Sequence, residues 1–133
     1  MSDPNNPCLF CNIHSEGIEL ENKLAYASYD SYPVSKYHTL IVPKRHVINY
    51  FELNSAEVLA CDALLKEIKN RLEKKDNTID GFNVGSNSGK TAGQSINHCH
   101  IHLIPRRSGD VENPQGGVRS VIASKQHYIR KNK

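Results

Sequence analysis

Hydrophobic and polar positions along this chain of 133 residues follow two different periods. Between Ser55 and Lys74, apolar side chains recur at steps of three and four, which predicts one amphipathic helix. Asn54, with Glu57 three residues later, is typical of a capping box at its start. The predicted apolar stripe consists of Val58, Cys61, Leu65, Ile68 and Leu72. We expect this helix to pack on a sheet and to carry no chemistry, with Cys61 as part of its core stripe.

Four other segments are rich in β-branched and aromatic residues and are bounded by turn residues, as strands are. They are residues 23–30, 37–43, 81–87 and 98–106. Residues 46–53 predict a short helix or an irregular crossover. Four strands, one main helix and short connections indicate an α+β fold with an antiparallel sheet.

Length and charge narrow the function classes. The chain fits a single domain, and its formal net charge of +3 lies largely in the last nine residues, which read as a solvated tail. A nucleic-acid partner would need a broader basic face, so none is expected. No apolar window approaches the roughly 18 residues of a membrane helix, and the first residues do not resemble a signal peptide. We therefore expect a cytoplasmic location without a membrane partner, where four cysteines are thiols or metal ligands.

The stretch "NHCHIHLIPRR", residues 97–107, places His98, His100 and His102 at every second position. On a strand these three side chains share one face and the apolar residues between them, including Cys99, share the other. Protonating all three adjacent imidazoles costs free energy because like charges at that spacing repel. Such a row therefore suits the binding of anionic oxygens or a metal. A solvent-facing strand that happens to carry histidines is the alternative. The preceding loop "SNSGKTAGQS", residues 86–95, suggests a phosphate subsite, although it lacks P-loop spacing.

The histidine strand and two longer blocks of the sequence resemble a known family. "HCHIHLI" matches the signature H-φ-H-φ-H-φ-φ, where φ is apolar, of the histidine triad family of nucleotide hydrolases and transferases. "YDSYPVSKYHTLIVPKRHV" and "AGQSINHCHIHLIPR" resemble the two conserved blocks of that family. The resemblance covers about residues 8–107 and leaves 108–133 as a C-terminal loop and basic tail. It implies a single domain of residues 1–133 with a five-stranded antiparallel sheet, one long and one short helix, and usually a homodimer.

The resemblance also implies the catalytic residues. His100 would attack the α-phosphorus of a nucleotide and form a nucleotidyl-histidine that water then hydrolyses. His102 would contact the phosphate and stabilise charge in the transition state. Ser95 would serve the leaving group or the α-phosphate, and His38 would face the triad across the site.

The expected binding residues follow in the same way. Asp30 would accept the ribose hydroxyls, with a turn residue before Pro33 as the alternative. The phosphate oxygens would be held by Asn87, Gly93 and Gln94. The base would be walled by Leu9, Phe10, Ile13 and Tyr29, most of which would serve equally well as core residues. Tyr37 stands where many members carry glycine, and we expect it to narrow the mouth of the cleft.

Cys8 and Cys11 have the spacing of metal ligands, but a pair supplies only two of the four ligands that tetrahedral zinc takes. In a subset of the family that this chain resembles, histidines at the positions of His46 and His98 complete the set. The resemblance thus implies a structural zinc, closed by four protein ligands and unable to activate water. The alternative is a group of reduced cysteines and hydrogen-bonded histidines.

The resemblance therefore implies a histidine triad hydrolase acting at the α-phosphate of a nucleotide, with a purine as the expected base. Its substrates would be dinucleoside polyphosphates or nucleoside 5′-phosphoramidates. Residues 105–122 carry Arg106, Arg107 and Arg119, which favour the polyphosphates if the segment folds over the cleft; an ordinary surface loop is the alternative. Rival interpretations are a nucleotide-binding module with little turnover and a catalytic metal site made of the three histidines. A zinc-dependent nucleic-acid binder lacks a basic, aromatic surface.

Overall fold

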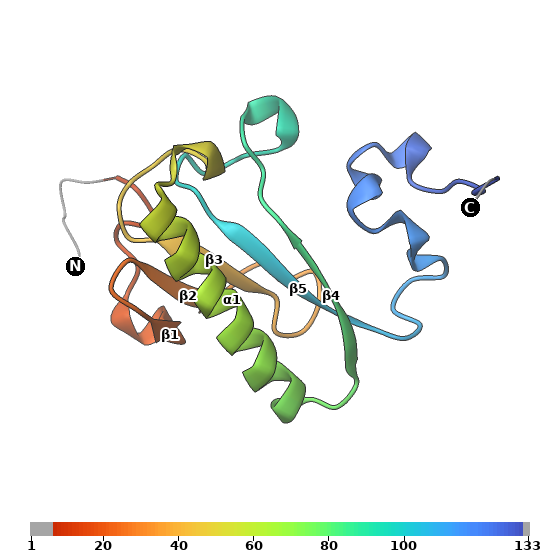
Figure 1. The fold of residues 1–133 in the computed structure, drawn as a ribbon, viewed down its shortest axis with the longest axis horizontal. Helices are drawn as coiled ribbons and strands as arrows, with labels where there is room; N and C mark the ends of the chain where they lie inside the picture. Colours follow the sequence, from red (N-terminus) through yellow and green to blue (C-terminus); the bar gives the residue numbers. More distant parts are fainter. Residues whose placement is uncertain (1–6, 132–133) are drawn as a thin grey trace.

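A computed structural model describes residues 7–131 of the chain. Its strands are β1 (Leu20–Glu21), β2 (Ala25–Tyr29), β3 (Thr39–Pro43), β4 (Ile79–Gly85) and β5 (Ile101–Arg107). They form one sheet in the order β1-β2-β3-β5-β4, and every neighbouring pair is antiparallel (Figure 1). The helix α1 spans Ser55–Lys75. The predicted α+β fold with a five-stranded antiparallel sheet is confirmed.

Shorter elements complete the chain and refine the predicted boundaries. The strand predicted at 98–106 begins only at Ile101, and β1 is an edge strand that the sequence did not indicate. The crossover predicted at 46–53 contains a short 3-10 helix, η2 (Tyr50–Glu52). The other 3-10 helices are η1 (Ser15–Gly17), η3 (Lys90–Ala92), η4 (Pro114–Val121) and η5 (Ala123–Lys125). The last two lie in the segment that was predicted to be loop and tail.

The start of α1 is the predicted capping box. The Asn54 side chain accepts a hydrogen bond from the backbone N–H of Glu57, whose carboxylate in turn accepts from the backbone N–H of Asn54. The buried residues of α1 are Glu57, Cys61, Leu64, Ile68 and Leu72. Leu64 therefore takes the central position predicted for Leu65, which is only partly buried, because the buried face follows steps of four and three from Glu57.

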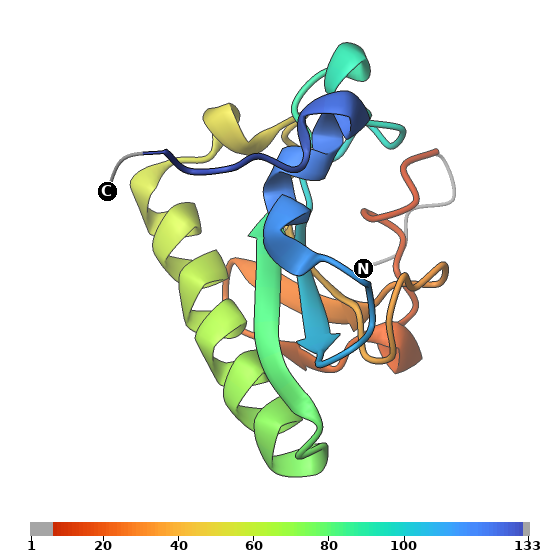
Figure 2. The same ribbon diagram turned by 90° about the vertical axis from the view of Figure 1, so that its right-hand side faces the viewer.

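The sheet has two different faces. One packs against α1, and its core includes Ala27, Ile41 and Leu103. The opposite face carries a second apolar cluster around Tyr26 and Leu40, which the N-terminal segment covers (Figure 2). Since successive strand residues alternate between faces, every strand under α1 also offers side chains to the second face, where the chemistry lies.

An ion pair missed by the sequence reasoning joins the turn after β3 to α1. Glu57 is 2% exposed, and Arg45 donates from its Nε and one terminal nitrogen to the two carboxylate oxygens, each at 2.8 Å. This bidentate contact with Arg45 lowers the pKa of the Glu57 carboxyl. The turn that carries His46 is thereby fastened to the start of the helix.

Tyr37 has a backbone φ of 74°, in the left-handed region where β-carbons are crowded. Its ring packs with Tyr29 at 5.8 Å and lies 4.8 Å from the Lys75 ammonium. These contacts place the ring on the α1 side of the sheet. The expectation that Tyr37 narrows the mouth of the cleft is therefore wrong.

The backbone at Tyr37 gives a direct test of strain. Tyr37→Gly and Tyr37→Ala both remove the ring contacts, but only alanine keeps the left-handed penalty of about 1–2 kcal/mol. We expect the glycine variant to have a free energy of unfolding about 1 kcal/mol higher than the alanine variant, the reverse of the usual order. Urea denaturation of both variants measures the difference. Equal stabilities would show that the backbone is not strained there.

Across residues 7–131, none of the helices combines the length and the apolar character needed to cross a bilayer.

Candidate functional site

A cleft with a volume of about 340 Å³ opens on the sheet face opposite α1. It lies between the N-terminal segment, β2, the loop before β5 and the first residues of β5. The predicted site residues that border it are Leu9, Phe10, Ile13, Tyr29, Asp30, Asn87, Gly93, Ser95, His100 and His102. The sequence reasoning missed five further residues of the cleft: Ser28, Ser31, Tyr32, Leu40 and Ile96. Of these, Ser28 and Leu40 could have been found from the alternation of side chains along the two predicted strands.

The histidine row alternates as predicted, even though His98 and His100 precede β5. The Phe10 ring contacts both His98 and His100, with centroids 5.9 Å and 5.0 Å apart, and His100 contacts His102 at 5.3 Å. On the other side, Cys99 is 1% exposed. The three imidazoles therefore occupy the cleft side, and the residues between them fill the core.

Hydrogen bonding assigns the tautomer of His100. Its Nδ1 lies 2.8 Å from the carbonyl oxygen of His98, which can only accept. Nδ1 therefore carries the proton and donates it, and Nε2 keeps its lone pair. The lone pair lies on a ring that is 9% exposed and borders the cleft, so it is available to an electrophile bound there.

His38 and His102 form a second, linked pair. The backbone N–H of Val34 donates to His38 Nδ1 at 3.1 Å, so His38 carries its proton on Nε2. That Nε2 donates to His102 Nδ1 at 2.8 Å and lies 3.4 Å from an Asp30 carboxylate oxygen. His102 consequently holds its proton on Nε2, on a ring that borders the cleft. A neutral donor is thus placed beside the His100 lone pair.

Burial, together with the neighbouring His100 and His38, lowers the pKa of His102 to about 4. Between about pH 6.5 and pH 4 the unfolded chain takes up a proton at this side chain and the folded chain does not. The contribution of neutral His102 to the free energy of unfolding is therefore fully present above pH 6.5 and is lost as the pH falls towards 4. We expect the unfolding free energy from urea titrations to fall over this range, and to fall less in His102→Gln. The exposed residue His127, changed to alanine, serves as the control and should leave the slope unaltered.

The connection between β4 and β5, which contains η3, has residues that face the cleft and one that does not. Asn87, Gly93 and Ser95 border the cleft, and Gly93 has a φ of 98°, which glycine adopts without a steric penalty. Gln94 is buried: its amide nitrogen donates to the carbonyls of Ile48 and Ile96, and its oxygen accepts from the backbone N–H of Gly89. The expectation that the Gln94 side chain holds phosphate oxygens is corrected, because its hydrogen bonds shape the loop instead.

Tyr29 is among the residues that border the cleft, but its ring packs on the α1 side of the sheet. Its hydroxyl accepts a hydrogen bond from Lys75 and its ring packs on Tyr37, both on the α1 side. Strand alternation places Ser28 on the cleft side. Of the four residues expected to contact a base, Leu9, Phe10 and Ile13 remain candidates. The Tyr29 ring is no longer one, because it lies on the other side of the sheet.

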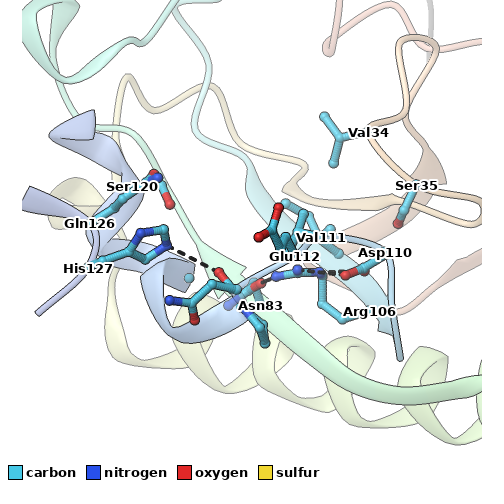
Figure 3. A pocket seen from close by; sticks show the side chains of 14 residues that line it. Val34, Ser35, Asn83, Arg106, Asp110, Val111, Glu112, Ser120, Gln126 and His127 are labelled. Carbon is cyan, nitrogen blue, oxygen red and sulfur yellow. Dashed lines mark hydrogen bonds and ion pairs between the residues drawn. The ribbon is translucent and has the colours of Figure 1, made fainter. Parts of the chain in front are cut away.

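Arg106, Arg107 and Arg119, the three arginines considered as phosphate ligands, bind other groups of the chain. Arg106 forms a bidentate ion pair with Asp110, at 2.7 and 2.9 Å, and also donates to Asn83 (Figure 3). Arg107 pairs with Asp76 at 3.0 Å. Arg119 donates to the carbonyl of Lys125. All three therefore have partners within the chain, and the first two have their charge balanced by a carboxylate.

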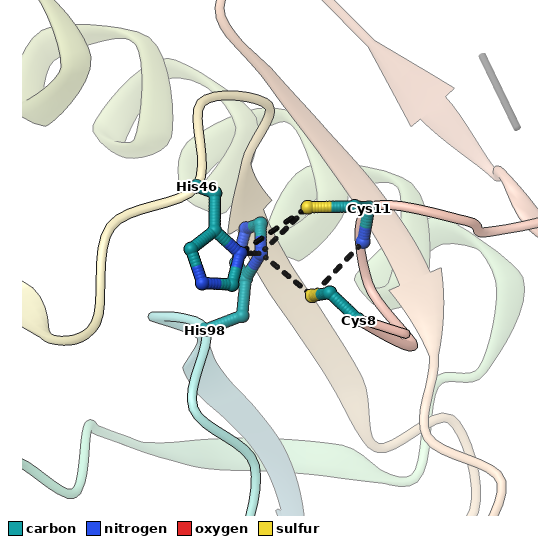
Figure 4. A group of neighbouring side chains, drawn as sticks. All are labelled: Cys8, Cys11, His46 and His98. Carbon is teal, nitrogen blue, oxygen red and sulfur yellow. Dashed lines mark hydrogen bonds between the residues drawn. The ribbon is translucent and has the colours of Figure 1, made fainter. Parts of the chain in front are cut away.

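Four side chains from three distant segments converge beside the cleft (Figure 4). His98 Nδ1 lies 3.2 Å from Cys8 Sγ, 3.5 Å from Cys11 Sγ and 3.1 Å from His46 Nδ1, and Cys11 Sγ lies 3.3 Å from His46 Nδ1. Ligands around a tetrahedral zinc are separated by about 3.3 Å for two nitrogens and about 3.5 Å for nitrogen and sulfur. His98 Nε2 donates to the Pro43 carbonyl, which leaves Nδ1 as an acceptor. The donor set and its spacing fit zinc.

A family model, the HIT domain, matches residues 15–109. The chain belongs to the HIT-domain family. A HIT-like protein of Methanocaldococcus jannaschii is 38% identical over 110 residues, covering 79% of this chain and 83% of its own. An adenosine 5′-monophosphoramidase of Saccharomyces cerevisiae is 36% identical over 104 residues, or 75% and 63%. A crystal structure of a histidine triad nucleotide-binding protein from Sulfolobus tokodaii is 34% identical, with a TM-score of 0.71 and coverage of 77% and 71%.

In this HIT-domain chain, the three histidines of the row do not share a metal. His98 Nδ1 faces the cysteines, His100 Nδ1 donates to a carbonyl, and His102 Nδ1 accepts from His38. The alternative of a three-histidine catalytic metal site is therefore wrong. Asp30, His38 and His102 are also close enough to share an ion, but the His38 Nδ1 lone pair is used by Val34, so its Nε2 is protonated and unsuited to a metal.

Proposed function

We propose that this chain is a cytoplasmic HIT-domain hydrolase that cleaves nucleotides at the α-phosphate through a nucleotidyl-His100 intermediate. The observation that carries the proposal is the His100 tautomer, with Nδ1–H held by the His98 carbonyl and the Nε2 lone pair on the cleft side. A nucleophile with one nitrogen fixed and the other unprotonated is oriented before substrate arrives.

The residues of the cleft divide the reaction between them. His100 Nε2 attacks the α-phosphorus, a P–N bond forms, and the bond to the leaving group breaks. His102 Nε2–H donates to a phosphate oxygen as charge grows there, and His38 holds His102 in that tautomer. Ser95 donates a hydrogen bond from its hydroxyl to the leaving group, which takes up a proton from solvent and departs as the neutral amine. Water then attacks the phosphorus and releases a proton to solvent, the P–N bond breaks, and His100 leaves as a neutral imidazole once more.

The ion pairs of Arg106 and Arg107 favour nucleoside phosphoramidates over dinucleoside polyphosphates as substrates. A polyphosphate tail needs cations that are not already neutralised, but Arg106 and Arg107 are paired with Asp110 and Asp76. An amine leaving group needs none. The name of the yeast relative, an adenosine 5′-monophosphoramidase, supports the same choice. Asp30 would accept the ribose hydroxyls, while Leu9, Phe10 and Ile13 would flank a purine base.

We propose that Cys8, Cys11, His46 and His98 hold a structural zinc, as in the zinc-containing members of the family. When bound, the ion would cross-link three segments and supply no catalytic water, because all four positions are taken by protein. The fit of the four donor atoms supports this assignment.

We also propose a homodimer formed along β4. That strand lies at the end of the sheet order, with one edge unpaired in the described chain. Beside it, a groove of about 500 Å³ is bordered by Tyr50, Phe51 and Val84, which are 40%, 82% and 48% exposed. Sedimentation equilibrium tests the dimer.

The test of the proposed activity compares two properties of the wild-type chain. Adenosine phosphoramidate and diadenosine polyphosphates are offered in parallel, and acid-labile nucleotidyl-protein is trapped by rapid quenching. We expect turnover and labelling with the phosphoramidate, and slower turnover with the polyphosphates. Binding of AMP without turnover of any substrate or any label would favour the alternative of a nucleotide-binding regulatory module.

A further inference from the structure

The side of the cleft that would contact a nucleotide base, here called the base wall, is formed by residues 8–13, a segment of turns outside any helix or strand. Leu9, Phe10 and Ile13 all border the cleft. Among the contacts that hold the segment, the Tyr26 hydroxyl donates to the Phe10 carbonyl at 2.7 Å. A segment of this kind lacks the ladder hydrogen bonds that fix a strand, so its order depends on side-chain contacts.

Cys8, Cys11, His46 and His98 form the cluster of candidate zinc ligands. Its two cysteines lie on either side of Phe10 in the sequence. Both of their sulfurs face His98 Nδ1, and Cys11 also faces His46. An ion bound there would therefore join the base wall directly to His98, three residues before the start of β5. Closing such a cross-link orders the segment without help from a nucleotide.

Phe10 is the point where the cluster and the cleft touch. Its ring packs edge-on against His98, at 5.9 Å and 84°, and also against His100 at 5.0 Å. The same His98 supplies the carbonyl that fixes the His100 tautomer. One side chain thus contacts a residue of the cluster, the nucleophile and the space for the base.

We propose that metal occupancy of the Cys8–Cys11–His46–His98 cluster and nucleotide occupancy of the cleft are coupled through Phe10. Zinc in the cluster raises the affinity of the cleft for nucleotide, because the base wall is already ordered when the nucleotide arrives. By linkage, nucleotide raises the affinity of the cluster for zinc by the same factor. The inference rests on the proposed function only in that the cleft binds a nucleotide; it does not need turnover.

The test measures zinc affinity with and without AMP on the full chain, by competition with a chromogenic chelator. We expect saturating AMP to lower the dissociation constant for zinc by roughly 5- to 150-fold. AMP titrations of the zinc-loaded and metal-depleted chain, with circular dichroism to confirm folding, should give the same factor. If the depleted chain unfolds, the zinc competition alone still measures the coupling.

Two variants separate coupling from mere stability. Phe10→Ala keeps all four donor residues, and we expect it to bind zinc while AMP changes its zinc affinity less than about twofold. Ile13→Ala, the matched control, also removes an apolar wall residue but lies outside the two cysteines. It should weaken AMP binding while retaining the wild-type ratio of zinc affinities.

The outcomes distinguish the inference from the function on which it rests. A wild-type chain that binds zinc and AMP independently overturns the inference and leaves the proposed hydrolase intact. A zinc-loaded chain that does not bind AMP overturns both. A chain that does not bind zinc overturns the inference and the zinc assignment but not the His100 chemistry.

Discussion

His100→Ala should lower kcat/KM for adenosine phosphoramidate by at least about 10⁴-fold, the scale seen when a covalent nucleophile is removed. The side chain supplies the only lone pair in the His98–His100–His102 row that is free of a hydrogen bond or the metal cluster and borders the cleft. Without it, no P–N bond forms and the nucleotidyl-protein should disappear along with turnover. Rapid quenching with radiolabelled substrate measures both.

The control for this prediction is His127→Ala, which removes an exposed histidine far along the chain and should leave kcat/KM unchanged. AMP binding by His100→Ala shows that the cleft survives. An acid-labile adduct that persists in the variant would show that another residue, such as His102, is the nucleophile.

Arg45→Ala should lower the Tm by roughly 5–10 °C. Glu57 is 2% exposed, and the substitution leaves its carboxylate without the guanidinium that donates two hydrogen bonds to it. The contact lowers the Glu57 pKa, so its contribution is complete above the ordinary value of 4.5 and is lost as the pH falls through the lower folded-state value. The difference in Tm from wild type should therefore shrink below pH 4.5. Thermal melts at several pH values measure it.

Two further variants test the cause. Lys69→Ala breaks a pair with Glu73 in which both side chains are nearly half exposed, and it should move the Tm by no more than about 2 °C. Adding Glu57→Gln to Arg45→Ala removes the buried charge and should recover part of the loss. If the double variant is less stable than Arg45→Ala, burial of an unpaired carboxylate is not the cause.

Features that depend on neighbours in sequence could be predicted. The capping box of Asn54 and Glu57 spans four residues, and the face of His100 follows from a strict period of two. The convergence of Cys8, Cys11, His46 and His98 could also be anticipated, but only through the resemblance to a family, because nothing local joins residue 8 to residue 98.

Features that depend on tertiary contacts could not be predicted. Gln94 turns away from the cleft because the Ile48 carbonyl, 46 residues earlier, accepts from its amide. Arg107 is neutralised by Asp76, which is 31 residues away. Tyr37 was assigned to the cleft from its chain position, whereas its positive φ turns the ring towards Lys75. In each case the decisive partner is far along the chain.

The alternation of residues 98–103 has a consequence for how this segment can change over evolutionary time. Substitutions here alter one face at a time, but a single-residue insertion or deletion exchanges the two faces of everything beyond it. The imidazoles would then enter the core beneath α1, and the apolar residues would enter the cleft. Length is therefore more tightly constrained than composition in this segment, and natural variation should appear there as replacement of residues and never as a change in their number.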